Sequence, residues 1–271
     1  MKTIGLIDYY ISEWHANKYL SILDDACKAV GEEFKIAYAY GELDVSLYDG
    51  LTTEEWCKKN DVIPCSSIKE VCERADYIMI LAPSNPEKHL EYAKEAFKYG
   101  KNIYIDKTFA QNLDEAKEIY AAAEKYGAKF FTSSALRYAS ELADVEGAKH
   151  LIVTGGGGNF PEYVIHQAEM AIKVFGDYAE DVSVTCQGAQ RICHASFSGG
   201  RSLTMIYAPS LSYTACAEMP DGSSVNRAMA SSFFNALLAD VLHFFLTDER
   251  SFPAEQTLAV MDLRDKVLIY D

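Results

Sequence analysis

The stretch of sequence that decides the fold is residues 77–108, which read YIMILAPSNPEKHLEYAKEAFKYGKNIYIDKT. The continuous apolar run Tyr77–Leu81 predicts a strand that is buried on both faces. A helix is expected over Pro86–Tyr99, where Gly100 supplies the left-handed residue that ends many helices. A second strand follows over Asn102–Ile105. Two strands joined by a helix predict a parallel pair, because a parallel connection needs a long crossover.

The same alternation of strand and helix continues on both sides of this unit. Further strands are expected at Lys2–Asp8, Phe34–Tyr40, Val62–Cys65 and Lys129–Thr132. Further helices are expected at Ser12–Val30, Thr52–Lys59, Ser67–Arg74 and Asn112–Tyr126. This order predicts an α/β fold, in which a Rossmann-like doubly wound parallel sheet of the dinucleotide-binding type spans residues 1–135.

The second half of the chain has a different pattern. Short runs separated by turn-forming segments predict strands at Val182–Gln187, Arg191–Phe197, Ser202–Tyr207 and Tyr213–Glu218. Helices are expected at about Pro161–Phe175, Asn226–Leu246 and Pro253–Val267. We therefore expect a smaller α+β domain over residues 136–271, with an antiparallel sheet of about four or five strands. Its C-terminal helix could pack back on the first domain.

Charge and cysteine content exclude several classes of function. The 271 residues include 25 Lys and Arg against 40 Asp and Glu, a formal net charge of −15. Such an acidic surface repels nucleic acid and anionic membranes, so neither is expected as a partner. The seven scattered cysteines form no C-x-x-C pair, which argues against a disulfide framework or a zinc site. With no secretory signal and no apolar run of about 20 residues, we expect a cytoplasmic protein.

Ligands of doubly wound sheets bind beyond the carboxyl ends of the strands, so the residues that follow each strand are candidates. These residues are Asp8, Tyr9, Tyr10, Tyr40, Gly41, Pro83, Ser84, Asn85, Asp106, Lys107, Thr108, Ser133 and Ser134. Lys107 could donate a hydrogen bond to a substrate oxygen, or it could be a solvated lysine paired with Asp106.

Two features of the second half could also carry chemistry. Glu162 and His166 are four residues apart on one predicted helix, and Glu169 follows three residues later, so the three share a face. This arrangement is compatible with a general base, with a metal ligand, or with a surface pair that has no catalytic role. No metal site is expected, because no partner set of ligands is visible. The run Gly155–Gly158 is either an anion-binding nest of backbone amides or a mobile loop.

Several motifs resemble those of a known family. Residues 75–89, ADYIMILAPSNPEKH, are similar to a D-x-V-x-I-x-x-P-x-x-x-H segment. Residues 96–108, AFKYGKNIYIDKT, are similar to A-x-x-x-G-K-x-V-x-x-E-K-P. Three shorter motifs follow in the same order at Leu136–Tyr138, Glu162–His166 and Phe252–Glu255. These motifs resemble those of the glucose–fructose oxidoreductase, inositol dehydrogenase and rhizopine-catabolism (Gfo/Idh/MocA) family, and the resemblance covers nearly the whole chain.

The resemblance implies an NAD- or NADP-dependent oxidoreductase that acts on a hydroxyl group of a sugar, a cyclitol or a similar small polyol. It implies that Lys107 polarises the reacting hydroxyl, that His166 exchanges its proton, and that Glu162 orients the substrate or tunes His166. The residues implied along the cofactor are Asp8, Tyr9, Ser12, Tyr40, Pro83, Ser84, Asn85, His89 and Asp106. Those implied for the substrate are Arg137, Tyr163 and Glu169.

The resemblance also implies a homo-oligomer that forms through the sheet of the second domain. An open sheet face rich in apolar side chains would need cover. The side chains that we expect on this face are Met205, Tyr207, Leu211 and Tyr213.

The chain departs from the family pattern at the cofactor site. Ile7, Tyr9 and Ser12 stand where three glycines would let a pyrophosphate approach the backbone. No acidic residue ends the second strand to take a ribose hydroxyl. Thr108 replaces a proline, so we expect a trans peptide bond after Lys107.

These departures keep two alternatives open. The first is a non-catalytic relative that binds a small ligand or a partner and has lost dinucleotide binding. The second is a lyase or isomerase that uses Lys107 and His166. The interval from Arg137 to His166 is short for the family, which predicts a shortened second domain.

Overall fold

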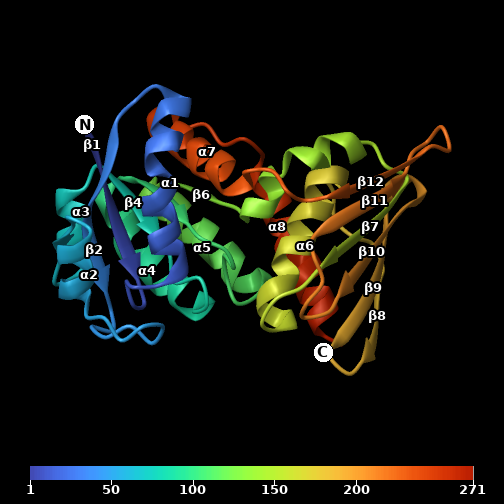
Figure 1. Cartoon of the computed structure of the whole chain (residues 1–271), viewed down its shortest axis with the longest axis horizontal. Helices are drawn as coiled ribbons and strands as arrows, with labels where there is room; N and C mark the ends of the chain where they lie inside the picture. The colour runs from blue at the N-terminus through green and yellow to red at the C-terminus, as the bar shows by residue number, and fades with distance from the viewer. Residues whose placement is uncertain (271) are drawn as a thin grey trace. The chain divides into compact units, whose positions relative to one another are not determined.

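The computed structural model describes residues 1–270, which form two compact units (Figure 1). Unit 1 contains residues 1–133 together with residues 235–251. Unit 2 contains residues 134–234 and the segment from Phe252 onward. The chain therefore passes from unit 1 to unit 2, returns for one helix, and ends in unit 2. The helix that returns is not the C-terminal one.

Unit 1 is built on a parallel sheet. Its six strands are β1 (Lys2–Asp8), β2 (Phe34–Gly41), β3 (Ile63–Pro64), β4 (Tyr77–Ile80), β5 (Asn102–Ile105) and β6 (Lys129–Thr132). Their order is β3-β2-β1-β4-β5-β6, and every neighbouring pair is parallel. The order of strands reverses between β1 and β4, which makes this pair the topological switch point. The predicted Rossmann-like fold is confirmed.

Helices connect the strands of unit 1. They are α1 (Trp14–Val30), α2 (Thr53–Lys59), α3 (Ile68–Arg74), α4 (His89–Ala96) and α5 (Leu113–Tyr126). Short 3-10 turns, η1 (Pro86–Lys88) and η2 (Phe97–Tyr99), flank α4, so the helix expected over Pro86–Tyr99 consists of three consecutive pieces. The central strands β4 and β5 are buried from Ile78 to Ile80 and from Ile103 to Ile105, as parallel strands covered on both faces should be.

Helix α7 (Phe233–Thr247) returns the chain to unit 1. Its Phe245 ring stacks on Tyr77 of β4, with ring centroids 4.8 Å apart. The expected helix over Asn226–Leu246 was wrong at its start, because Ser224–Ala228 forms a strand. That strand pairs with residues Thr214–Glu218 of unit 2 through backbone hydrogen bonds. The local residue pattern does not predict this pairing.

Unit 2 contains a second six-stranded sheet. Its strands are β7 (His150–Gly155), β8 (Val182–Gln187), β9 (Gln190–Phe197), β10 (Arg201–Tyr207), β11 (Thr214–Glu218) and β12 (Ser224–Ala228). Their order is β12-β11-β7-β10-β9-β8. Only β7 and β10 pair in parallel, so the sheet is mixed and mostly antiparallel. The α+β class is confirmed, but the expected four or five strands were too few, because β7 and β12 were missed.

Two helices, α6 (Phe160–Phe175) and α8 (Ala254–Leu268), lie along one face of this sheet (Figure 1). Short 3-10 segments complete the unit at η3 (Ala135–Tyr138), η4 (Ser140–Val145) and η5 (Ser198–Gly200). Met205 and Tyr207 are buried, and the Tyr207 ring contacts Phe160 of α6. The expectation that Met205 and Tyr207 lie on an open face was therefore wrong, because alternation along β10 points both of them toward the helices.

The run Gly155–Gly158 is a packed segment rather than a nest or an open loop. A side chain at Gly155 would collide with the ring of Tyr213, and one at Gly157 would collide with the ring of Tyr163. Tyr213 also donates its hydroxyl to a carbonyl within the run (2.7 Å). These glycines allow two tyrosine rings to lie directly against the backbone. Over residues 1–270, no helix combines the length and the apolar character that crossing a membrane requires.

The packing of unit 1 leads to a first prediction at Gly5 of β1. A side chain there would collide with Val71 of α3 and approach Ala75 Cβ to 3.0 Å. Gly5→Ala should lower the free energy of unfolding by about 1–3 kcal/mol, because an added methyl group overpacks a filled core. Urea unfolding measures the change. Gly158→Ala is the control, since its nearest neighbour would be Tyr163 Cε2 at 3.6 Å. A Gly5→Ala protein as stable as wild type would contradict the packing of α3 on β1.

Candidate functional site

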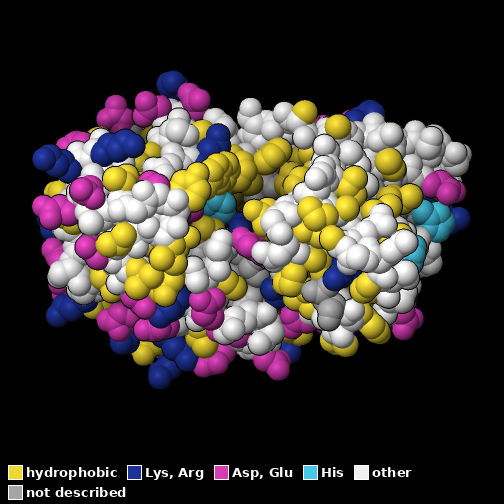
Figure 2. Space-filling view, turned by 60° about the horizontal axis from the view of Figure 1, so that its bottom comes forward, with side chains coloured by type: hydrophobic (Ala, Val, Ile, Leu, Met, Phe, Trp, Pro, Cys, Tyr) yellow, Lys and Arg dark blue, Asp and Glu magenta, His cyan; other side chains and the backbone are white. Residues whose placement is uncertain are grey.

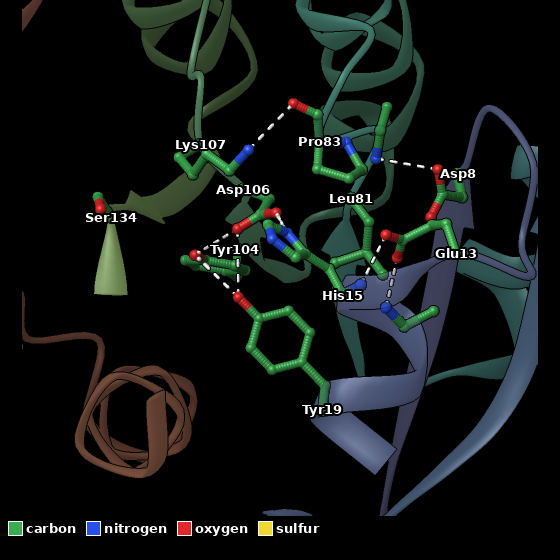
Figure 3. A network of polar contacts seen from close by, with 12 residues as sticks. Asp8, Glu13, His15, Tyr19, Leu81, Pro83, Tyr104, Asp106, Lys107 and Ser134 are labelled. Carbon is green, nitrogen blue, oxygen red and sulfur yellow. Dashed lines mark hydrogen bonds and ion pairs between the residues drawn. The ribbon is translucent and has the colours of Figure 1, made fainter. Parts of the chain in front are cut away.

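At the switch point the carboxyl group of Asp8 joins the ends of β1 and β4 (Figure 3). Its Oδ1 atom accepts hydrogen bonds from the backbone amides of Tyr9 (2.7 Å) and Ala82 (3.0 Å). Asp8 is 1% exposed, and its Oδ2 atom has no hydrogen-bond partner among residues 1–270. Burial raises the pKa of Asp8 well above its usual range, and the charges of Glu13 and Asp106 add to this against the two amide hydrogen bonds. An expected cofactor residue is therefore used to close the switch point.

Glu13 caps the N-terminus of α1 with its own carboxylate (Figure 3). One oxygen accepts from the His15 amide (2.6 Å), and the other accepts from the Ala16 amide. These amides belong to the second and third residues of the helix, which an N-cap side chain normally satisfies. Glu13 is 5% exposed. Burial raises the pKa of Glu13, against the charge of His15 and the two amide hydrogen bonds.

Asp106, directly after β5, is the centre of a buried polar network (Figure 3). Its Oδ1 atom accepts from the hydroxyls of Tyr104 (2.9 Å) and Tyr19 (3.2 Å), and its Oδ2 atom is paired with His15 Nδ1. Burial alone would raise the pKa of Asp106, but His15, Lys107 and the hydrogen bonds lower it overall. Asp106, expected along the cofactor, thus holds α1 against β5.

Lys107 follows Asp106 and is 7% exposed. Its ammonium group donates to the carbonyl of Pro83 at 3.4 Å, so two expected site residues lie together (Figure 3). The peptide bond between Lys107 and Thr108 is cis, and the expectation of a trans bond was wrong. Both residues are buried, so their tertiary surroundings outweigh the preference of an isolated peptide.

The loop that follows β2 is hydrogen-bonded to the loop that follows β1. The amides of Glu42 and Leu43 donate to the carbonyls of Asp8 (3.1 Å) and Tyr9 (2.7 Å). Backbone hydrogen bonds thus join the two loops beyond the last paired residues of β1 and β2. The residues after Tyr40 therefore cross the end of β1 instead of leaving it open.

Side chains of these two loops are joined as well. Ser12 is buried and donates to the carboxylate of Asp49 (2.7 Å). Glu42, which could have replaced the missing acid after the second strand, accepts from Lys88 (2.6 Å) and from the Tyr92 hydroxyl (2.7 Å). Ser12 and Glu42 are therefore both paired with other residues of unit 1.

His89 is fully buried, and both of its ring nitrogens face backbone carbonyls. Nε2 lies 2.6 Å from the Leu81 carbonyl oxygen, and Nδ1 lies 3.1 Å from that of Phe109. Burial lowers the pKa of His89, against these hydrogen bonds. His89 was expected along the cofactor, but it joins the end of β4 to the segment after Lys107.

A dinucleotide makes definite demands on the end of β1. In a Rossmann-type site its pyrophosphate lies against the amides at the start of the first helix, and a glycine-rich backbone approaches it closely. Here Glu13 takes those amides and Asp8 places a carboxyl group at the switch point. These residues do not fit a pyrophosphate in that position. Of the expected cofactor residues, Tyr40, Pro83, Ser84 and Asn85 remain candidates.

In unit 2, the imidazole of His166 on α6 is hydrogen-bonded to Ser134, with 2.6 Å between Nδ1 and Oγ. Ser134 Oγ also accepts from the amide of Leu136 (3.3 Å) at the start of η3, which fixes its position. The His166 ring lies edge-on to the rings of Tyr163 and Tyr213, each with centroids 5.8 Å away. A half-buried imidazole oriented in this way suits proton transfer.

Glu162 belongs to the N-terminal cap of α6. Its amide donates to Asn159 Oδ1 (2.9 Å), and the Asn159 amide group donates back to the Glu162 carboxylate (3.0 Å). Burial raises the pKa of Tyr163, and the charge of Glu162 adds to this rise. The carboxylate therefore acts electrostatically on Tyr163, an expected substrate residue.

Arg137 and Glu169 form a buried ion pair, with 3.2 Å between Nη1 and Oε2. Glu169 also accepts from the amide of Ser134 (3.0 Å). The Arg137 guanidinium lies 3.7 Å from the ring centroid of Phe252 and is hydrogen-bonded to Gln256. Burial raises the pKa of Glu169, against the charge of Arg137 and these hydrogen bonds. These contacts support a structural role in unit 2, and the expected substrate role of both residues stays a prediction.

The spacing of Glu162, His166 and Glu169 had left a metal set open. In the part of the chain that the structure describes, no group of three or more His, Cys, Asp or Glu side chains is placed to hold a metal ion.

Sequence reasoning missed Glu13, His15, Tyr19 and Tyr104 as organisers of this region. The predicted helix began at Ser12, the usual type of capping residue, whereas the helix begins at Trp14 and Glu13 is its cap. The pairing of Asp106 with His15 joins residues that are 91 positions apart, so a local sequence pattern cannot predict it.

The raised pKa of Asp8 leads to a second prediction. An acid whose pKa is raised on folding stabilises the fold below about 3.8, its unfolded pKa, and that contribution is lost as the pH rises through the folded pKa. Asp8→Asn cannot ionise, so its stability relative to wild type should increase between pH 4 and pH 8 by about 1 kcal/mol or more. Urea unfolding at several pH values measures this difference. Asp25→Asn, the same substitution at an exposed carboxyl group, is the matched control. A pH-independent difference for Asp8→Asn would refute the assignment.

Sequence comparison identifies relatives of unit 1. A family described as an oxidoreductase family with an NAD-binding Rossmann fold matches residues 43–134. The uncharacterized oxidoreductase YhhX of Escherichia coli (strain K12) is 36% identical over 62 residues, which are 23% of this chain and 18% of that protein. The match thus spans less than a fifth of the length of that relative.

Solved structures resemble the chain over its whole length. The dehydrogenase MviM from Clostridium difficile has a TM-score of 0.78 at 13% identity, covering 100% of this chain and 99% of that one. UDP-N-acetylglucosamine 3-dehydrogenase GnnA from Acidithiobacillus ferrooxidans has a TM-score of 0.77 at 13% identity, covering 99% and 97%. At these identities the likeness shows the fold. The motifs of residues 75–108 lie inside the segment 43–134, and it is over this segment that the chain matches the Gfo/Idh/MocA oxidoreductase family.

Proposed function

We propose that this protein is an oxidoreductase that acts on a hydroxyl group of a sugar, a cyclitol or a similar small polyol. The observation that carries the proposal is the buried Lys107 at the end of β5, inside the segment that matches the family. The likeness in fold to a dehydrogenase named for a nucleotide sugar supports the substrate class. Fold alone does not carry function, so the proposal rests on the site residues.

Each catalytic role is assigned to one group. Lys107 would donate a hydrogen bond to the reacting hydroxyl oxygen, and its low exposure would strengthen that interaction. His166, whose imidazole is oriented by its hydrogen bond with Ser134, would exchange the hydroxyl proton. Glu162 would orient the substrate or raise the pKa of Tyr163. The phenol of Tyr163 would form a hydrogen bond with the substrate.

We propose NAD or NADP as the cofactor, because the matched family is described by an NAD-binding Rossmann fold. When bound, it would supply the hydride acceptor. Tyr40, Pro83, Ser84 and Asn85, which lie at the ends of β2 and β4, are the proposed contacts. Asp8 and Ser12 at the end of β1 are not among the proposed contacts, because their side chains are hydrogen-bonded within unit 1.

A second candidate function is favoured by Glu13. Because its carboxylate takes the first amides of α1, the chain could be a relative that binds a small polyol and no dinucleotide. Reduction of NAD or NADP by the protein and a polyol separates the two candidates.

We also propose that the chain forms a homo-oligomer through the sheet face of unit 2 that faces away from α6. Ile152 is 41% exposed on β7, and Ile206 on β10 alternates with the buried Met205 and Tyr207. Apolar side chains on such a face favour association with a second copy.

The catalytic proposal predicts the effect of two substitutions. Lys107→Met and His166→Asn should each lower kcat for polyol oxidation by about 10²–10⁴-fold, the usual range for loss of an acid–base group. The rate is followed as NADH or NADPH formed with a panel of sugars and cyclitols.

Each variant has a control in which the same type of residue is replaced in the same way at an exposed position. Lys98→Met and His194→Asn alter exposed residues of the same types and should leave kcat unchanged. Wild-type protein that reduces neither cofactor with any member of the panel would reject the oxidoreductase, as would full activity of Lys107→Met.

A further inference from the structure

The N-terminus of α1 is the strongest anion-binding element that the end of β1 offers. A helix leaves its first amides unsatisfied and carries a partial positive charge there. Helix α1 has 17 residues, so this charge is fully developed. The two amides that point forward, those of His15 and Ala16, are both bonded to the carboxylate of Glu13.

The surroundings of this carboxylate are unfavourable to further negative charge. The charge of Asp106 raises the pKa of Glu13, and the charge of Glu13 raises the pKa of Asp8, so the three carboxyl groups lie close together. All three are buried, and charge interactions are strong where water is excluded. The nearby His15 imidazole is paired with Asp106. A pyrophosphate would thus meet three carboxyl groups.

The backbone closes the same place from the other side. Glu42 and Leu43 donate their amides to the carbonyls of Asp8 and Tyr9. At Gly41 a side chain would lie 3.2 Å from the Ile11 amide nitrogen and 3.2 Å from the Leu43 carbonyl oxygen, so the two loops are in close contact. The approach that a glycine-rich loop normally leaves to phosphate is occupied by protein.

We propose that Glu13 is itself the anion of the α1 N-terminus and that this chain makes no pyrophosphate contact there. A nucleotide that uses unit 1 is therefore held through its base, sugar or nicotinamide and gains nothing from its phosphates at α1. The inference goes beyond the proposed function and does not depend on it, because catalysis at Lys107 and His166 is measured separately.

The test follows the His15 and Ala16 amide signals of the full, ¹⁵N-labelled chain by NMR while inorganic pyrophosphate or ADP is added. In wild type these signals should not move up to about 1 mM ligand. In Glu13→Ser they should shift saturably, with an apparent affinity at least about tenfold above wild type. Serine is a strong N-cap, so α1 keeps its start while its second amide is released. Glu13→Asn serves as a second variant with the same properties.

Two matched variants define the cause. Glu13→Gln keeps one acceptor oxygen but replaces the other with an NH2 group, which cannot accept from a backbone amide, so it should release one amide and respond as Glu13→Ser does. Glu54→Ser places a serine at an exposed residue in the first turn of α2 and should behave as wild type. Saturable shifts in wild type would overturn the proposal. So would Glu13→Ser and Glu13→Asn proteins whose amide signals stay in place. Failure of the oxidoreductase proposal appears instead as absent polyol oxidation with unchanged amide behaviour.

Discussion

The hydrogen bond from the Ala82 amide to the carboxyl group of Asp8 links the carboxyl ends of β1 and β4. A parallel sheet directs backbone groups toward its switch point, where a bound ligand would normally meet them. In this chain an internal carboxyl group meets them. The loops after β1 and β2 then pair with each other, and Glu13 turns back onto its own helix. The switch point is therefore satisfied by the protein itself.

This arrangement places three acidic side chains, Asp8, Glu13 and Asp106, in a buried region at the switch point. Burial makes additional negative charge unfavourable there. Asp8 and Glu13 have raised pKa values because burial disfavours their charged forms, whereas the His15 imidazole lowers the pKa of Asp106. The lowered pKa of Asp106 and the raised pKa values of Asp8 and Glu13 show that one carboxylate of this buried group is stabilised by its neighbours, whereas the other two are disfavoured by burial. Lys107 extends the network toward Pro83, which keeps one cation at the end of β5.

Unit 2 uses its polar residues differently. The ion pair of Arg137 with Glu169 and the cation–aromatic contact with Phe252 hold the start of unit 2 against its C-terminal segment. His166 is half-buried and hydrogen-bonded to Ser134, which is fully buried. On helix α6, Glu169 thus has structural contacts, whereas His166 is suited to proton transfer. The spacing of the two residues in the sequence does not distinguish these roles.

The sequence by itself determined the architecture of unit 1, because alternating apolar strands and capped helices are local signals with one favourable parallel arrangement. It also determined the position of Lys107 at a strand end and of His166 on a helix. Only the tertiary structure decided β12, the cis bond after Lys107, the packing of Gly155–Gly158 and the internal use of Asp8. Each of these features depends on its own set of contacts between residues that are distant in the sequence. In each, burial and hydrogen bonding outweigh the local preference of the chain.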